Sequence, residues 1–171
     1  MSGPARDPGA GEASAPAGER VWDYPRPPAV LACDRRVRVE LCGVTLADSG
    51  SALRVLETSH PPTIYIPPAD VRLDLLAPSA QRASWCEFKG AAGYLDALLA
   101  GRRWEAVAWS YADPAPAYAR LREHIAFYPA RVDGAWLGEE RVQAQEGDFY
   151  GGWITAELVG PFKGAAGTLG W

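Results

Sequence analysis

Hydrophobic and polar positions alternate over short stretches of the chain, and glycine or proline interrupts the alternation every few residues. Residues 37–41 carry valine or leucine at every second position with charged side chains between them, a period of two that is typical of a half-buried strand. Cys42-Gly43 supplies a turn, so residues 44–47 are predicted to return as the second strand of a hairpin. Similar patterns predict further strands at residues 52–57, 63–66, 84–88, 94–99, 103–109, 125–132 and 135–137.

One stretch has helical spacing instead. Ala117, Leu121 and Ile125 recur at intervals that place them on one face of a helix, so residues 116–124 are predicted to form a short helix. Many short strands with a single helix late in the chain disfavour a parallel α/β sheet. We therefore predict a mainly β fold in which two antiparallel sheets meet at an angle, in a sandwich-like arrangement.

The chain divides into three regions. Residues 1–20 contain few large apolar side chains and are predicted to be a disordered tail. Residues 21–34 contain Trp22, Tyr24 and several prolines, and we interpret them as an extended strap with its two rings docked on the domain. Residues 35–171 are predicted to be a single β-rich domain. Its C-terminal segment is rich in glycine and aromatic residues, which indicates either a lid over a ligand or a cover for a sheet edge.

Composition and charge exclude several functions. Hydrophobic residues make up 48% of the 171 residues and charged residues 22%, as in an ordinary globular protein. The net charge is -4 and no basic face is evident, which disfavours nucleic-acid binding. The chain lacks an apolar stretch long enough to cross a bilayer and a secretory signal at its start. We therefore expect a cytoplasmic protein whose partner is a small molecule.

The cysteines support the same compartment. Cys33, Cys42 and Cys86 are an odd set without C-x-x-C spacing, which favours reduced thiols over a disulfide framework. Together with His60 they would supply four zinc ligands only if the fold gathered all of them. We therefore predict no metal site and no cofactor.

Several motifs occur in a recognisable order: Val37-Arg38-Val39, Ala47-Asp48-Ser49, Glu57-Thr58-Ser59-His60-Pro61-Pro62, Trp85-Cys86-Glu87-Phe88-Lys89-Gly90, Ala108-Trp109-Ser110-Tyr111 and Ile125-Ala126-Phe127-Tyr128. With them the chain resembles the family called domain of unknown function 427, which also carries a nucleotidyltransferase-like label, over residues 21–171. Both ends of this region are similar to those of actinobacterial-type members, which implies a bacterial protein. The resemblance also implies a tent-like arrangement of two antiparallel sheets.

The chain departs from the family in one strand and does not match the label's chemistry. Leu95-Asp96-Ala97-Leu98-Leu99 stands where members often have Tyr-Ser-Val-Thr-Val, which makes this strand more apolar. Many nucleotidyltransferases pair a Gly-Ser turn with two closely spaced carboxylates that hold magnesium. Gly50-Ser51 is present, but no D-x-D pair follows it.

The strongest candidates for reactive or ligand-binding side chains lie in residues 85–90. If these residues continue a strand, Glu87 and Lys89 share one face while Cys86 points to the other with Phe88. Lys89 enters a glycine-rich bend and is a candidate ligand for an anion, with Glu87 orienting it. The alternative is a solvated ion pair between the two.

Cys86 is a candidate nucleophile if a base activates it, and His60 is the natural base. The alternative, which the strand alternation favours, is that Cys86 is a small buried hydrophobe. His60 precedes Pro61-Pro62 in a rigid turn, where it is either a catalyst or a hydrogen-bonded turn residue.

Aromatic residues and one arginine complete the candidate pocket. Trp109 and Tyr111 share a strand face, and with Tyr128 they carry polar groups that a dry core must satisfy. Arg54, flanked by Leu53 and Val55, points away from their face and is an anion ligand if that side is enclosed.

Two functions stay open from the sequence. In the first, Arg54, Lys89 and the three rings enclose a small polar or anionic ligand, sugar-like or nucleotide-like, without metal. In the second, the chain is a metal-independent enzyme that uses Cys86 and His60 with Glu87, or Lys89, or it has the nucleotidyltransferase-like activity that the family label suggests.

Overall fold

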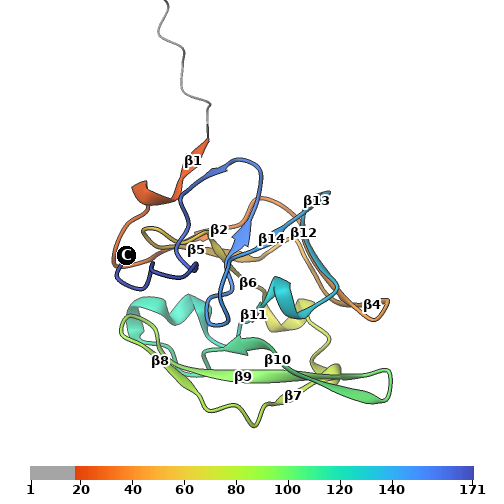
Figure 1. The fold of residues 1–171 in the computed structure, drawn as a ribbon. Coiled ribbons are helices and arrows are strands. Elements are labelled where there is room, and N and C mark those ends of the chain that lie inside the picture. The colour runs from red at the N-terminus through yellow and green to blue at the C-terminus, as the bar shows by residue number, and fades with distance from the viewer. Residues whose placement is uncertain (1–17) are drawn as a thin grey trace, which may run out of the picture.

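The computed structural model describes residues 18–171, and the strands in this part of the chain pair mainly antiparallel (Figure 1). The largest sheet has the order β11 (Ile125–Phe127), β10 (Arg102–Ser110), β9 (Gly90–Leu99) and β7 (Leu76–Pro78), and β8 (Ser84–Cys86) also pairs with β9. The second sheet has the order β13 (Glu140–Arg141), β12 (Gly134–Leu137), β3 (Val37–Leu41) and β4 (Val44–Ser49). The third has the order β2 (Ala29–Ala32), β5 (Leu53–Leu56) and β6 (Thr63–Tyr65).

Two short pairs complete the sheets. The strands β14 (Gln143–Ala144) and β15 (Trp153–Ile154) pair antiparallel, and β1 (Glu19–Arg20) pairs in parallel with β16 (Leu158–Val159). In Figure 1 the strands β7 to β10 lie along the bottom of the view, while β2, β5, β12 and β13 lie above them. The third sheet joins the first where Ile66 and Ile125 exchange two backbone hydrogen bonds of 2.8 Å. The predicted mainly β, antiparallel fold is confirmed.

Within residues 18–171, helical structure is limited to short 3-10 turns. The helix predicted at residues 116–124 is a 3-10 element, η4 (Pro116–Leu121), whose helical dihedrals break at Tyr118. Proline stands at its first helical position, where a missing N–H costs nothing. The other turns are η1 (Val21–Asp23), η2 (Pro68–Asp70), η3 (Leu73–Leu75) and η5 (Pro129–Arg131). No helix in the described residues is long and apolar enough to cross a membrane.

Alternation along β3 produces the main core. Val37, Val39 and Leu41 are at most 1% exposed, whereas the residues between them are not buried, as the period of two predicts. The same cluster contains Phe127 from β11 and Trp153 from β15, both nearly inaccessible. The C-terminal segment therefore contributes to the core and is not an appendage.

A buried carboxylate shapes the long hairpin. Asp96 on β9 is 2% exposed, and its two oxygens accept hydrogen bonds of 2.7 Å from the backbone N–H of Ala106 and from Arg103 Nη1. Ala106 has a φ of 45° and lies in a bulge where the pairing of β9 with β10 shifts register. Asp96 lies in the segment where the chain departs from the family's usual residues. It fixes the bulge beyond which lie Trp109 on β10 and Tyr111 just after the strand.

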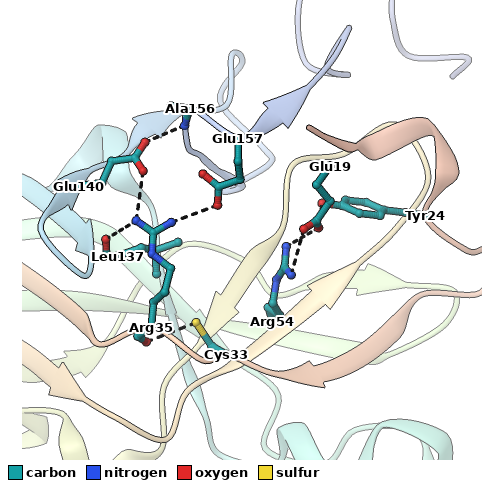
Figure 2. A network of polar contacts seen from close by, with 9 residues as sticks. All are labelled: Glu19, Tyr24, Cys33, Arg35, Arg54, Leu137, Glu140, Ala156 and Glu157. Carbon is teal, nitrogen blue, oxygen red and sulfur yellow. Dashed lines mark hydrogen bonds and ion pairs between the residues drawn. The ribbon is translucent and has the colours of Figure 1, made fainter. Parts of the chain in front are cut away.

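The two terminal segments are held by arginines in the network that Figure 2 shows. Arg35 reaches Glu157 at 3.0 Å and Glu140 at 3.1 Å, and it donates to the carbonyl of Leu137 at 2.7 Å. Glu140 in turn accepts a hydrogen bond from the backbone N–H of Ala156. Arg35 therefore fastens the chain around β16 to the β12–β13 hairpin.

Two residues of the predicted N-terminal tail form a strand. Residues 1–17 of the predicted tail lie outside the described part, but Glu19 and Arg20 form β1. Within the predicted strap, residues 29–32 are a sheet strand, β2, because they pair with β5. Tyr24 is buried as expected, whereas Trp22 is 40% exposed and donates to the carbonyl of Pro161.

Replacing Asp96 with asparagine is expected to destabilise the fold. A neutral amide retains only one of the two oxygens that Ala106 and Arg103 use, and it removes the charge. We expect the free energy of unfolding to fall by about 1.5–3 kcal/mol, the range for a hydrogen bond to a charged group. Urea unfolding followed by tryptophan fluorescence measures the change.

The control is Asp74→Asn, which removes an exposed carboxylate paired with Arg72. An exposed pair of this kind contributes little, so the unfolding midpoint should stay nearly constant. Equal losses in the two variants would contradict the role assigned to Asp96.

Candidate functional site

A cavity of about 350 Å³ lies between the β8–β9 hairpin, the ends of β5 and β6, and the C-terminal segment. Seven of the eight residues that the sequence nominates line it: His60, Cys86, Glu87, Lys89, Trp109, Tyr111 and Tyr128. Arg54 is the exception. Its Nη2 lies 2.5 Å from Glu19 Oε1, and Glu19 also accepts from the hydroxyl of Tyr24 (Figure 2). Arg54 therefore holds the N-terminal segment and does not reach the cavity.

The strand expected through residue 88 ends at Cys86. Residues 87–89 form a tight turn, which Gly90 closes with a φ of 104° as the first residue of β9. The backbone N–H of Ala115 donates to the carbonyl of Lys89 at 2.9 Å and fixes the turn. Because a turn has no alternating faces, the predicted separation of Cys86 from Glu87 and Lys89 is wrong, and all three line the cavity.

The floor of the cavity consists of buried rings. The ring centroids of Trp109 and Tyr128 lie 4.5 Å apart, and Tyr65 stands edge-on to Trp109 at 6.2 Å. Trp109 donates its indole N–H to the hydroxyl of Tyr65 at 3.3 Å. Burial raises the pKa of Tyr65, Tyr111 and Tyr128, so these phenols stay protonated at neutral pH and act as neutral hydrogen-bonding groups.

A chain of three polar side chains forms the opposite wall. Gln145 is 4% exposed, its Oε1 accepts from the N–H of Gly152 at 3.0 Å, and its Nε2 donates to the carbonyl of Lys163 at 2.6 Å. The same Nε2 lies 3.1 Å from His60 Nδ1, which must therefore be the acceptor. The proton of a neutral His60 is then on Nε2, which lies 3.0 Å from Glu57 Oε2.

These contacts decide the electrostatics of the wall. Burial alone would raise the pKa of Glu57, but the hydrogen bond from His60 and the nearby charges of Lys89 and Arg26 outweigh it, and the pKa is lowered. Glu57 is therefore ionised at neutral pH. Both ring nitrogens of His60 have partners, so this geometry leaves neither one available to take a proton from Cys86.

Positive side chains outnumber carboxylates around the cavity. Arg26, Lys89 and Lys163 line it, against Glu57 and Glu87. Lys163 is 9% exposed, its Nζ donates to the main-chain oxygen of Trp171 at 3.2 Å, and it lies 5.3 Å from the ring centroid of Tyr150. Counted by side chains, three cationic groups and two carboxylates therefore stand beside the aromatic floor.

The glycine-rich C-terminal segment is a wall of this cavity. Phe149 and Tyr150 line it, and the hydroxyl of Tyr128 donates to the carbonyl of Phe149 at 2.9 Å. A Cβ at Gly151 would overlap the ring of Trp109, and one at Gly152 would lie 2.5 Å from Pro61 Cγ. Only glycine lets the backbone approach the rings this closely, which accounts for the pair of glycines.

Sequence reasoning missed several lining residues, among them Arg26, Glu57, Tyr65, Gln145 and Lys163. Glu57 had a usable signal, because it lies three residues before His60 in one of the family motifs. Gln145 and Lys163 had none, since their position depends on how the C-terminal segment returns across the sheets. In residues 18–171, no group of three or more histidine, cysteine, aspartate or glutamate side chains is placed to hold a metal ion.

Comparison with known proteins identifies the family of the chain. The family model described as Domain of unknown function (DUF427) matches residues 29–138, more than half of the chain. No curated protein matches the chain. The matched region contains the aromatic floor and the β8–β9 turn, and it ends before Gln145 and the rest of the C-terminal wall.

Replacing Gly151 with alanine is expected to displace the C-terminal wall. The added methyl group would overlap Trp109, and overpacking of this kind costs about 1–3 kcal/mol of unfolding free energy. Thermal unfolding measures the loss, and a change in tryptophan fluorescence would report the altered surroundings of Trp109.

Gly50→Ala is the matched control, because a Cβ there meets nothing within 4 Å. It should leave stability and fluorescence nearly constant. A Gly151→Ala protein as stable as wild type would show that the segment does not pack on the ring as described.

Proposed function

We propose that this chain, which belongs to the family described as domain of unknown function 427, binds a small ligand with a flat ring and an anionic group. The partner is a small molecule, not a nucleic acid or a membrane. The observation that carries the proposal is the cavity itself, where buried rings and cationic side chains line the same space. An apolar site with a few convergent polar groups is the usual form of a ligand pocket.

The volume limits the size of the ligand. Ligand pockets commonly span about 300–1,000 Å³, and a cavity of about 350 Å³ lies at the small end of that range. It suits one ring system with short substituents, such as a nucleoside monophosphate, a sugar phosphate or an aromatic carboxylic acid.

Lys89 is the proposed partner of the anionic group. It is half-buried in a tight turn whose carbonyl is tied to Ala115, so its backbone is fixed before the ligand arrives. An anchored cation loses less conformational freedom on binding than one on a mobile loop. The protonated hydroxyls of the tyrosine floor offer neutral hydrogen bonds to the ring substituents.

The enzyme alternative rests on one observation, the position of Cys86 in the cavity wall. A thiol there could attack a bound electrophile if a base activated it. His60 does not supply that base in this geometry, because Gln145 and Glu57 occupy its two nitrogens. Ligand binding is therefore the function that the site supports best.

A reducing compartment is consistent with this function. All three cysteines are free, and they lie at separate places: Cys33 is buried, Cys42 is exposed and Cys86 is partly exposed in the cavity. Free thiols of this kind persist in the cytoplasm, which we propose as the location.

A thermal-shift screen tests the proposal. The panel contains nucleoside monophosphates, sugar phosphates, aromatic carboxylates and inorganic phosphate. We expect at least one ring-bearing anion to stabilise the protein. Lys89→Ala should lower the affinity for that compound at least about tenfold, because a hydrogen bond between charged groups contributes about 1.5–3 kcal/mol.

The matched control is Arg82→Ala, which removes the same charge from an exposed position outside the cavity. Its affinity for the compound should equal that of the wild type. Equal weakening by both variants would indicate nonspecific attraction, and no stabilisation by any compound would refute the proposed function.

Alkylation separates the two functions. An unactivated Cys86, partly shielded by the cavity, should react with iodoacetamide more slowly than the exposed Cys42 in the same protein. Peptide mass spectrometry over time gives both rates. A Cys86 that reacts many times faster than Cys42 would favour thiol chemistry over simple binding.

A further inference from the structure

Glu57 differs from the other charged groups of the cavity in how firmly it is held. Its backbone carbonyl accepts from the N–H of His60 at 3.0 Å, and its side-chain Oε2 lies 3.0 Å from His60 Nε2. The turn that contains both residues is tied to each terminal segment, because Ser59 donates to Val21 and accepts from the N–H of Lys163 at 2.8 Å. The carboxylate is therefore fixed before any ligand binds.

The histidine that orients Glu57 is itself fixed. Gln145 holds Nδ1 on one side, and the ring of Tyr150 packs edge-on at 4.7 Å between centroids. Gln145 cannot turn its amide over without losing the hydrogen bonds to Gly152 and Lys163. Such a supporting arrangement is typical of groups that bind a partner in a defined direction.

A carboxylate accepts about four hydrogen bonds, and His60 supplies one to Glu57. The side chain is 21% exposed and lines the cavity. It is thus able to accept a pair of donors from a ligand, whereas an anion without donors would only be repelled. The neighbouring charges of Lys89 and Arg26 disfavour a ligand that is a simple cation.

We propose that Glu57 binds the ligand directly, by accepting two adjacent N–H or O–H donors from it, and that His60 and Gln145 are its positioning residues. The inference rests on the proposed function and narrows its ligand class. The ligand carries a donor pair for Glu57 as well as an anionic group for Lys89. Two common sources have this chemistry: the edge of a guanine-type base, and the vicinal hydroxyls of a sugar.

Three nucleotides distinguish the sources. GMP carries both donor pairs, IMP lacks the 2-amino group of the base, and dGMP lacks the 2'-hydroxyl. Isothermal titration of the full chain is expected to give binding of GMP, and removal of one of the two features should weaken it about tenfold or more. The feature whose loss weakens binding identifies the source.

The variant Glu57→Gln makes the test specific to this carboxylate. Glutamine keeps an oxygen for His60 Nε2–H but presents an N–H₂ group in place of the second oxygen. The substitution should lower the affinity for GMP about tenfold or more. It should also abolish the difference in affinity between GMP and the analogue that binds worse. Glu139→Gln, at an exposed position outside the cavity, should retain the wild-type pattern.

The outcomes of these titrations can be told apart from those of the thermal-shift screen. If Glu57→Gln binds GMP as the wild type does, or if GMP does not bind, the inference is overturned. In either case a Lys89-dependent compound from the screen would leave the proposed function standing. A Glu57→Gln protein that unfolds at a lower temperature is compared by its ratio of GMP to analogue affinity, which a purely structural defect would not change.

Discussion

A single primary amide determines how the cavity is closed. Gln145 accepts from Gly152, donates to Lys163 and donates to His60, so it connects two parts of the C-terminal segment to the turn after β5. A primary amide has distinct donor and acceptor ends, and each of these partners requires one of them. The position of the wall, the tautomer of His60 and the direction of Glu57 therefore follow from one buried side chain.

The rest of the molecule supports this arrangement through two arginines at its periphery. Arg35 binds the chain around Glu157, and Arg54 binds Glu19 in the N-terminal segment (Figure 2). Each pair is partly exposed, and such pairs contribute little singly. Their value is geometric, because they fix segments that would otherwise depend on β1 and β16, which are two residues each.

Local sequence patterns correctly predicted the features that depend only on neighbouring residues, such as strand faces and turns. The alternation in β3 predicted its buried face, and the glycine at residue 101 separates two strands as expected. The same logic failed after Cys86, where the chain turns although its residues still resemble a strand. Arg54 could not be placed without knowing that Glu19 returns beside it. Gln145 is likewise a plain polar residue in the sequence, and only the tertiary fold gives it three partners.

The close approach of Gly151 to Trp109 joins the C-terminal segment directly to the floor of the cavity. The floor and the β8–β9 turn lie inside the region that the family model matches, whereas Gln145, Phe149, Tyr150 and Lys163 lie beyond its end. Phe149 and Tyr150 belong to no strand of the larger sheets, so substitutions at these two positions would change the shape of the wall more directly than the pairing of those sheets. The ligand preference of this fold would thus depend on a few wall side chains that no strand of the larger sheets contains.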